Sequence, residues 1–159
     1  MKLLKNINWK NIVFFIAPLV LYIVPNLFFK IDKEYYYSLN GPHLPPVVFI
    51  IVWSIIYILM SILISYYINL YLKTKDKSLI KLFVFIGVNY LFNIMYIPFF
   101  FMLKELFLSF VICLIVFFSI TFVALESLTH NKKITILTLP YIVWSVVATV
   151  FSILFYLQN

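Results

Sequence analysis

Five apolar runs of membrane-spanning length follow one another along this chain and leave little room for any other kind of structure. They cover residues 11–29, 46–72, 79–101, 106–126 and 134–157. The hydrocarbon core of a bilayer is about 30 Å thick, so a helix needs about 20 apolar residues to cross it. Backbone polar groups find no partner in lipid, so each run is expected to be helical. The sequence therefore predicts an all-α integral membrane protein, with residues 1–159 forming one bundle of five transmembrane helices.

Composition and charge exclude several classes of protein. Hydrophobic residues make up 65% of the 159 residues and charged residues 11%, and the mean hydropathy is +1.11. Soluble domains carry about 25% charged residues, so this balance fits a bilayer better than water. The 12 lysines are scattered and come without arginine, which disfavours a nucleic-acid-binding face. The single cysteine, Cys113, excludes an intrachain disulfide and a cysteine metal cluster.

The first apolar run is expected to be a membrane helix that stays in the protein. The basic segment MKLLKNINWK precedes it, as in a signal peptide, but the run is about span length and no small-residue cleavage site follows it. The longest connection, residues 30–45, contains the turn-favouring sequence Asn40-Gly41-Pro42. With five spans, the two termini are expected on opposite sides of the membrane.

The lysines predict the orientation of the bundle. One set of termini and connections carries nine of them: Lys2, Lys5, Lys10, Lys73, Lys75, Lys77, Lys81, Lys132 and Lys133. The other set carries three: Lys30, Lys33 and Lys104. Because lysines concentrate on the cytoplasmic side of membrane proteins, the N-terminus is expected inside and the C-terminus outside.

Ionisable residues are missing from the middle of the apolar runs. The acids and histidines all lie in connections or near helix ends: Asp32, Glu34, His43, Asp76, Glu105, Glu126 and His130. A proton relay or ion pathway needs such groups at mid-membrane, so pumps and metal transporters are disfavoured. The pattern also lacks paired carboxylates and a Cys/His arrangement for acid–base or nucleophilic catalysis. An odd number of spans disfavours a simple inverted-repeat transporter.

Neutral polar and aromatic residues instead recur at helical spacing on three of the runs. They are Phe49, Trp53 and Tyr57 on the second, Asn89, Asn93 and Tyr96 on the third, and Tyr141 and Trp144 on the fifth. One interpretation is structural, because aromatic residues form interfacial belts and asparagine joins membrane helices. The other is a pocket for a flat apolar ligand, with aromatic walls and a few hydrogen-bonding groups. These eight residues are therefore the candidate ligand-binding residues.

Three sequence blocks on these runs resemble one known family. LPPVVFIIVWSIIYILM carries a Pro-Pro start followed by Phe49, Trp53 and Tyr57. NYLFNIMYIPFFF and LPYIVWSVVATVFSILFYLQN follow in the same order and at similar spacing, with the residues Asn89, Asn93, Tyr96, Pro98, Phe100, Phe101, Pro140, Tyr141, Trp144, Ala148 and Asn159. Together the blocks resemble the TspO/MBR family, the tryptophan-rich sensory proteins and translocator proteins also known as peripheral-type benzodiazepine receptors.

The resemblance implies a homodimeric five-helix membrane protein, here expected in a bacterial cell membrane, that acts as a porphyrin receptor or sensor. It implies a tetrapyrrole ring lying against Trp53, Tyr57 and Trp144, with hydrogen bonds from Asn93 and Tyr141. Residues 30–45 would then cover the ligand, and Lys30 or Lys33 would meet its propionates. Porphyrin is expected as a ligand, with no metal or other cofactor and no nucleic-acid partner.

Two other functions remain open from the sequence. Light- and oxygen-dependent breakdown of porphyrin would make the protein an enzyme, and Trp144 and Trp53 would then be its reactive residues. The third possibility is transport of small hydrophobic molecules across the bilayer, although the sequence contains no site for a coupling ion.

The chain also departs from the family pattern. Val47 stands where many members have a pocket tryptophan, Tyr96 where tryptophan is usual, and Ser152 where asparagine is usual. Only three tryptophans are present: Trp9, Trp53 and Trp144. The cholesterol motif of animal members is absent, because no basic residue follows Tyr156. The loss of an aromatic at position 47 weakens the enzymatic interpretation.

Overall fold

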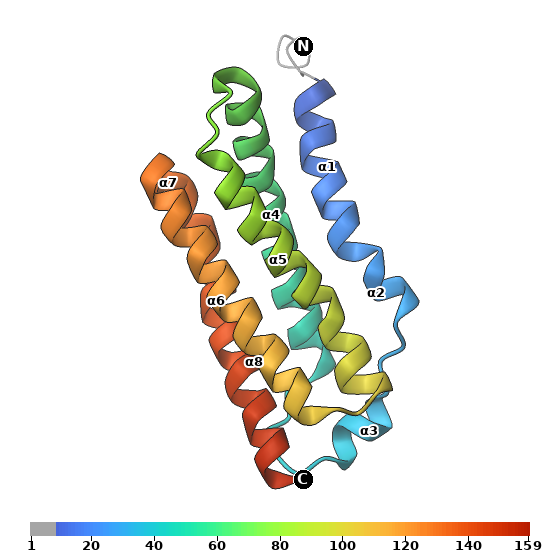
Figure 1. Ribbon diagram of the computed structural model, residues 1–159. Helices are drawn as coiled ribbons and strands as arrows, with labels where there is room; N and C mark the ends of the chain where they lie inside the picture. The colour runs from blue at the N-terminus through green and yellow to red at the C-terminus, as the bar shows by residue number, and fades with distance from the viewer. Residues whose placement is uncertain (1–8) are drawn as a thin grey trace.

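The computed structural model describes residues 9–159, and all regular secondary structure in that range is helical (Figure 1). The elements are α1 (Trp9–Ile23), α2 (Pro25–Phe28), α3 (Lys33–Ser38), α4 (Pro46–Thr74), α5 (Leu79–Ile97), a π-helical turn (Pro98–Met102), α6 (Leu106–His130), α7 (Lys132–Thr135), a 3₁₀ turn (Ile136–Thr138) and α8 (Leu139–Gln158). Four stretches are long and apolar enough to cross a bilayer: α4, α5 with its π-helical turn, α6, and residues 132–158.

The first expected span differs from the other four. Instead of one helix over 11–29, the structure has α1, with 15 residues, and then the four-residue α2. The break falls at Val24 because Pro25 has no backbone N–H to continue the helical ladder. At 1.5 Å per residue α1 is roughly 22 Å long. It is therefore an apolar helix shorter than the hydrocarbon core of about 30 Å.

Helix ends lie beyond the ends of the apolar runs at two places. Helix α4 continues to Thr74 and stops where Lys75 adopts a left-handed conformation, with φ of 55° and its N–H bonded to the carbonyl of Tyr71. Helix α6 continues to His130, four residues past the expected end at Glu126. A charged side chain ends the apolar pattern but leaves the backbone hydrogen bonds intact, so hydropathy places these ends too early.

The described helices pack in two groups, and a seam lies between them. Helix α1 packs mainly against α4, whereas α5 and α8 both pack against α6. Contact between α1 and α4 includes the rings of Tyr22 and Tyr57, stacked with centroids 5.0 Å apart. Many large apolar side chains face outward, as expected for helices whose outer surface is covered by lipid. The fold and composition therefore describe an integral membrane protein.

Candidate functional site

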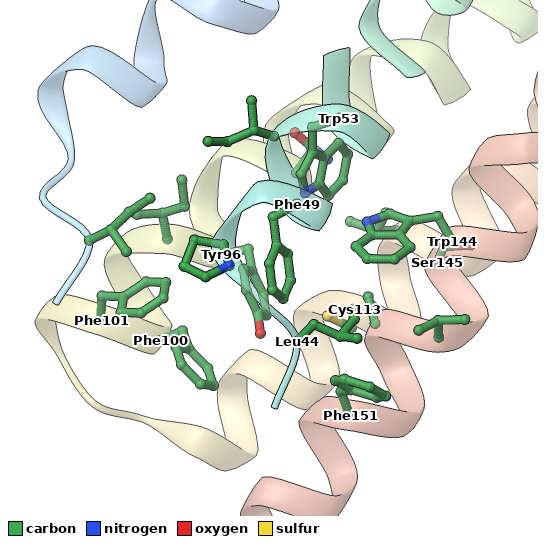
Figure 2. Close-up of a pocket in the computed structure, with 18 of the residues that line it drawn as sticks. Leu44, Phe49, Trp53, Tyr96, Phe100, Phe101, Cys113, Trp144, Ser145 and Phe151 are labelled. Carbon is green, nitrogen blue, oxygen red and sulfur yellow. The ribbon is translucent and has the colours of Figure 1, made fainter. Parts of the chain in front are cut away.

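A cavity of about 550 Å³ occupies the seam between α4 and the α5–α6–α8 group (Figure 2). Small-molecule sites typically measure roughly 300–1,000 Å³, so the volume suits an organic ligand. Ten of the 25 lining residues are aromatic: Tyr36, Phe49, Trp53, Tyr57, Tyr96, Phe100, Phe101, Trp144, Phe151 and Phe155. Among the described residues that line the cavity, Lys33 is the one with a charged side chain. This composition favours a flat apolar ligand whose anionic groups lie at the end of the cavity that holds Lys33.

Six of the eight candidate residues line this cavity: Phe49, Trp53, Tyr57, Asn93, Tyr96 and Trp144. The other two, Asn89 and Tyr141, do not. Asn89 is completely buried one turn before Asn93, and its amide donates to the carbonyl of Val116 at 3.2 Å and the hydroxyl of Ser119 at 3.0 Å. It therefore joins α5 to α6. Ligand contact by the six lining residues stays a prediction.

The wall on α4 follows directly from the helical spacing of its aromatic residues. Pro46 occupies the first turn of α4, where a missing N–H costs no hydrogen bond, and Phe49, Trp53 and Tyr57 then follow on one face. The rings of Trp53 and Tyr57 have centroids 5.4 Å apart. Phe49 meets Trp144 of α8 edge to face at 5.7 Å. The rings of α4 therefore form one wall of the cavity, and Phe49 connects this wall to Trp144 on α8.

The indole of Trp144 supplies a polar group without a protein partner. Its Nε1 is buried and has no hydrogen-bond acceptor among the described residues. Figure 2 shows this nitrogen on the side of the ring that faces Phe49. A buried donor left unsatisfied costs about 1–3 kcal/mol. Because this nitrogen has almost no accessible surface, it is the ring of Trp144, rather than its N–H, that lines the cavity.

Asn93 and Tyr141 form a hydrogen bond with each other. The Nδ2 of Asn93 donates to the Tyr141 hydroxyl at 2.9 Å, which joins α5 to α8. The ring of Tyr141 also meets Trp53 edge to face at 5.7 Å. Tyr141 therefore supports two lining residues from behind, and Asn93 is the only one of this pair that reaches the cavity.

Two positions that depart from the family pattern lie in contact. The Tyr96 hydroxyl is 3.3 Å from the Ser152 hydroxyl, and the Cys113 thiol lies 3.3 Å from the same oxygen. Because its hydroxyl is held by Ser152, Tyr96 presents its ring to the cavity. That ring stacks on Phe100 with centroids 5.4 Å apart and forms a flat wall.

Residues 30–45 cover one end of the cavity. Asp32 caps α3 by accepting from the N–H of Tyr35 at 3.0 Å. Tyr36, on α3, is buried, packs on Phe155 and lines the cavity. The N–H of Leu44 donates to the Tyr36 hydroxyl at 2.9 Å. Burial raises the pKa of Tyr36 above its ordinary value, so this hydroxyl stays neutral.

The same segment is held against the end of α8 by paired amides. The N–H of Asn40 donates to Oδ1 of Asn159 at 2.9 Å, and Nδ2 of Asn159 donates to the Asn40 carbonyl at 2.9 Å. Gly41 follows with φ of +139°, and a Cβ there would lie 2.9 Å from the Phe155 ring. Glycine is therefore required for this close approach, which seats the segment on the cavity.

The structure shows which residues singled out from the sequence line the cavity and which do not. Lys33 lines the cavity and Lys30 does not. Val47 is 55% exposed and also lies outside the lining. Phe151 and Phe155 also line the cavity and are not among the candidates from the sequence, although their spacing continues the face of α8 that begins at Trp144.

Within residues 9–159 no group of three or more His, Cys, Asp and Glu side chains is placed to hold a metal ion.

Comparison with known proteins identifies the family of this chain. The model of the TspO/MBR family matches residues 8–157, nearly the whole sequence. No curated protein matches the chain.

Proposed function

Because the chain belongs to the TspO/MBR family, we propose that it is a membrane receptor or sensor that binds porphyrins or similarly flat hydrophobic molecules in the cavity. The single observation that carries this proposal is the aromatic lining of the cavity, with stacked or crossed rings on two of its walls. Aromatic rings bind other flat rings by offset stacking and edge-to-face contact, and they bury large apolar areas.

Two polar groups give this proposal chemical detail. Lys33 is exposed at the end of the cavity covered by residues 30–45, so it can meet a propionate while its own charge stays in water. The side-chain amide of Asn93 is a second polar group in the lining. Both groups fit an amphiphilic ring system that carries carboxylates on one edge.

The proposed assembly has five spans, with α1 and α2 together forming the first, and two copies in a homodimer. A short hydrophobic helix is tolerated in a bilayer by local thinning of the membrane. We place the protein in a bacterial cell membrane, with the N-terminus inside and the C-terminus outside. Of the nine lysines that predict this orientation, Lys2 and Lys5 lie outside the described residues.

The binding proposal is tested by a pair of variants that break one hydrogen bond from its two ends. Asn93→Leu is expected to weaken protoporphyrin binding by about 1–3 kcal/mol, because it also removes an amide from the cavity. Tyr141→Phe removes the same bond behind the wall and is expected to leave the affinity close to wild type. The measurement is a porphyrin titration of purified protein in detergent, beside its thermal unfolding. Equal losses of affinity in both variants would assign Asn93 to structure alone.

The orientation is tested by labelling intact cells with a membrane-impermeant maleimide. Ser38 and Thr74 are both exposed and are the last residues of α3 and α4. Figure 1 shows α3 and the connection from α4 to α5 at opposite ends of the bundle. In a Cys113→Ser background, Ser38→Cys is expected to react from outside, and Thr74→Cys only after the cells are permeabilised. The reverse pattern would overturn the proposed topology.

A second candidate function, light-driven breakdown of porphyrin, is favoured by one observation. Both tryptophans that would carry the reaction, Trp53 and Trp144, line the cavity. An indole in contact with a bound ring is a potential one-electron donor.

A further inference from the structure

The two ends of the bundle differ strongly in charge. At the end that holds the α4–α5 and α6–α7 connections, residues 73–81 and 126–133 contain six lysines against two acids, Asp76 and Glu126. At the other end, residues 30–45 and 104–105 contain three lysines and three acids. The first end therefore carries a strong excess of positive charge, whereas the charges at the second end balance one another.

The two basic connections are joined into one surface. The side-chain amide of Asn131 donates to the Tyr66 hydroxyl at 2.7 Å, and the Tyr67 hydroxyl lies 2.7 Å from that of Ser127. These bonds tie the end of α4 to the end of α6. Lysines that are far apart in the sequence thus belong to one end of the folded protein.

Of the two acids at this end, one is paired with a lysine and the other is hydrogen-bonded to the backbone of its own connection. Glu126 forms an ion pair with Lys81 at 2.9 Å. Asp76 accepts from the N–H of Ser78 at 2.9 Å, and this bond lowers the pKa of its carboxyl. Five exposed lysines have no carboxylate partner among the described residues: Lys73, Lys75, Lys77, Lys132 and Lys133.

Exposed apolar side chains lie within four residues of these lysines in the sequence. They are Leu72, Ile80, Leu128 and Ile136, each at least 44% exposed. Lysines next to lipid-facing apolar side chains lie at the depth of the phospholipid headgroups. A soluble anion would use only the charges, whereas a phospholipid uses both the charges and the apolar side chains.

We propose that this basic end, defined by Lys73, Lys75, Lys77, Lys132 and Lys133, is a binding surface for the headgroups of anionic phospholipids. Clusters of four to eight basic residues beside membrane helices attract anionic lipids, and each lysine near the surface adds to the attraction. The ligand class is an anionic diacyl phospholipid in the leaflet that contacts this end.

The test measures lipid binding to the full chain purified in detergent. Phosphatidylglycerol and phosphatidylcholine are added in turn, and bound lipids are counted by native mass spectrometry. The wild type is expected to bind phosphatidylglycerol more tightly, by on the order of tenfold or more, and salt should reduce the difference. Equal affinity for the two lipids would overturn the proposal.

Matched variants test which lysines cause the preference for phosphatidylglycerol. Replacing Lys75, Lys77, Lys132 and Lys133 by glutamine is expected to remove the preference for phosphatidylglycerol. Replacing Lys30 and Lys104 by glutamine at the other end, which leaves the cavity lining intact, is expected to leave the preference unchanged, and equal losses in both variants would refute the assignment. If the fourfold variant does not fold, Lys75→Gln/Lys77→Gln and Lys132→Gln/Lys133→Gln separately should each reduce the preference. Displacement of phosphatidylglycerol by equimolar glycerol phosphate would show a soluble-anion site and overturn the lipid assignment.

Discussion

Replacing Ala148 by tryptophan is expected to reduce porphyrin affinity at least about a hundredfold, equivalent to about 2.7 kcal/mol. Ala148 lines the cavity one helical turn after Trp144, so an indole at this position occupies space that the ligand needs. The cavity is open at this point, and the new side chain therefore enters a void without displacing a packed core. The thermal stability of the protein should be kept or raised while binding is lost.

The matched control is Val146→Trp, two residues earlier on the same helix. Val146 is 44% exposed and lies outside the cavity lining, so the same indole there faces lipid. Its porphyrin titration is expected to match the wild type. If Ala148→Trp also binds porphyrin normally, the ligand site is elsewhere and the proposed function fails at this cavity.

A large effect is also expected on light-driven breakdown of bound porphyrin. In this reaction an indole gives one electron to the light-excited ring, and the reduced ring passes that electron to molecular oxygen, which becomes superoxide. The indole radical cation then takes an electron back from the ring, and superoxide combines with the resulting ring radical cation, so the net change is the addition of one O₂ to the ring. In the wild type, Trp53 is already packed between Tyr57 and Tyr141, and Trp144 contacts Phe49. We therefore expect slow breakdown in the wild type.

The structure determines at which position a new tryptophan should speed the breakdown of porphyrin. From the sequence, Val47 is the position to restore, but its side chain lies outside the cavity, whereas Ile50 on the next turn lines it. Ile50→Trp is therefore expected to speed the breakdown severalfold, and Val47→Trp to leave it unchanged. The measurement is the loss of porphyrin absorbance under illumination in air, with equal amounts of bound porphyrin and a protein-free control. Rapid wild-type loss that Trp144→Phe abolishes would replace the receptor interpretation with the enzymatic one.

Sequence periodicity was most informative on α4. Phe49, Trp53 and Tyr57 line the cavity as a single face, because residues four apart lie above one another on any α-helix. The break at Pro25 was visible in the sequence as a proline, but the apolar run continued through it. Hydropathy measures only the preference for lipid, so it joined two helices that the backbone separates.

Periodicity could not decide which residues on a face reach the cavity. Asn89 and Asn93 share one face of α5, yet Asn89 bonds to α6 and Asn93 lines the cavity. The difference arises because Asn89 meets the backbone and Ser119 of α6, whereas Asn93, one turn later, meets Tyr141 of α8 beside the cavity. A helical pattern gives the direction of a side chain, and only the neighbouring helices determine what it meets.

The sequence by itself determined that this protein is helical, lies in a membrane and belongs to its family, because these properties depend on local composition and spacing. Only the tertiary structure brought Tyr36 against Phe155, joined Asn40 to Asn159, and gathered the lysines of two connections at one end. The residues that make these contacts lie 65 to 119 positions apart along the chain. Contacts over such distances depend on how the helices pack, and no short stretch of sequence records that arrangement.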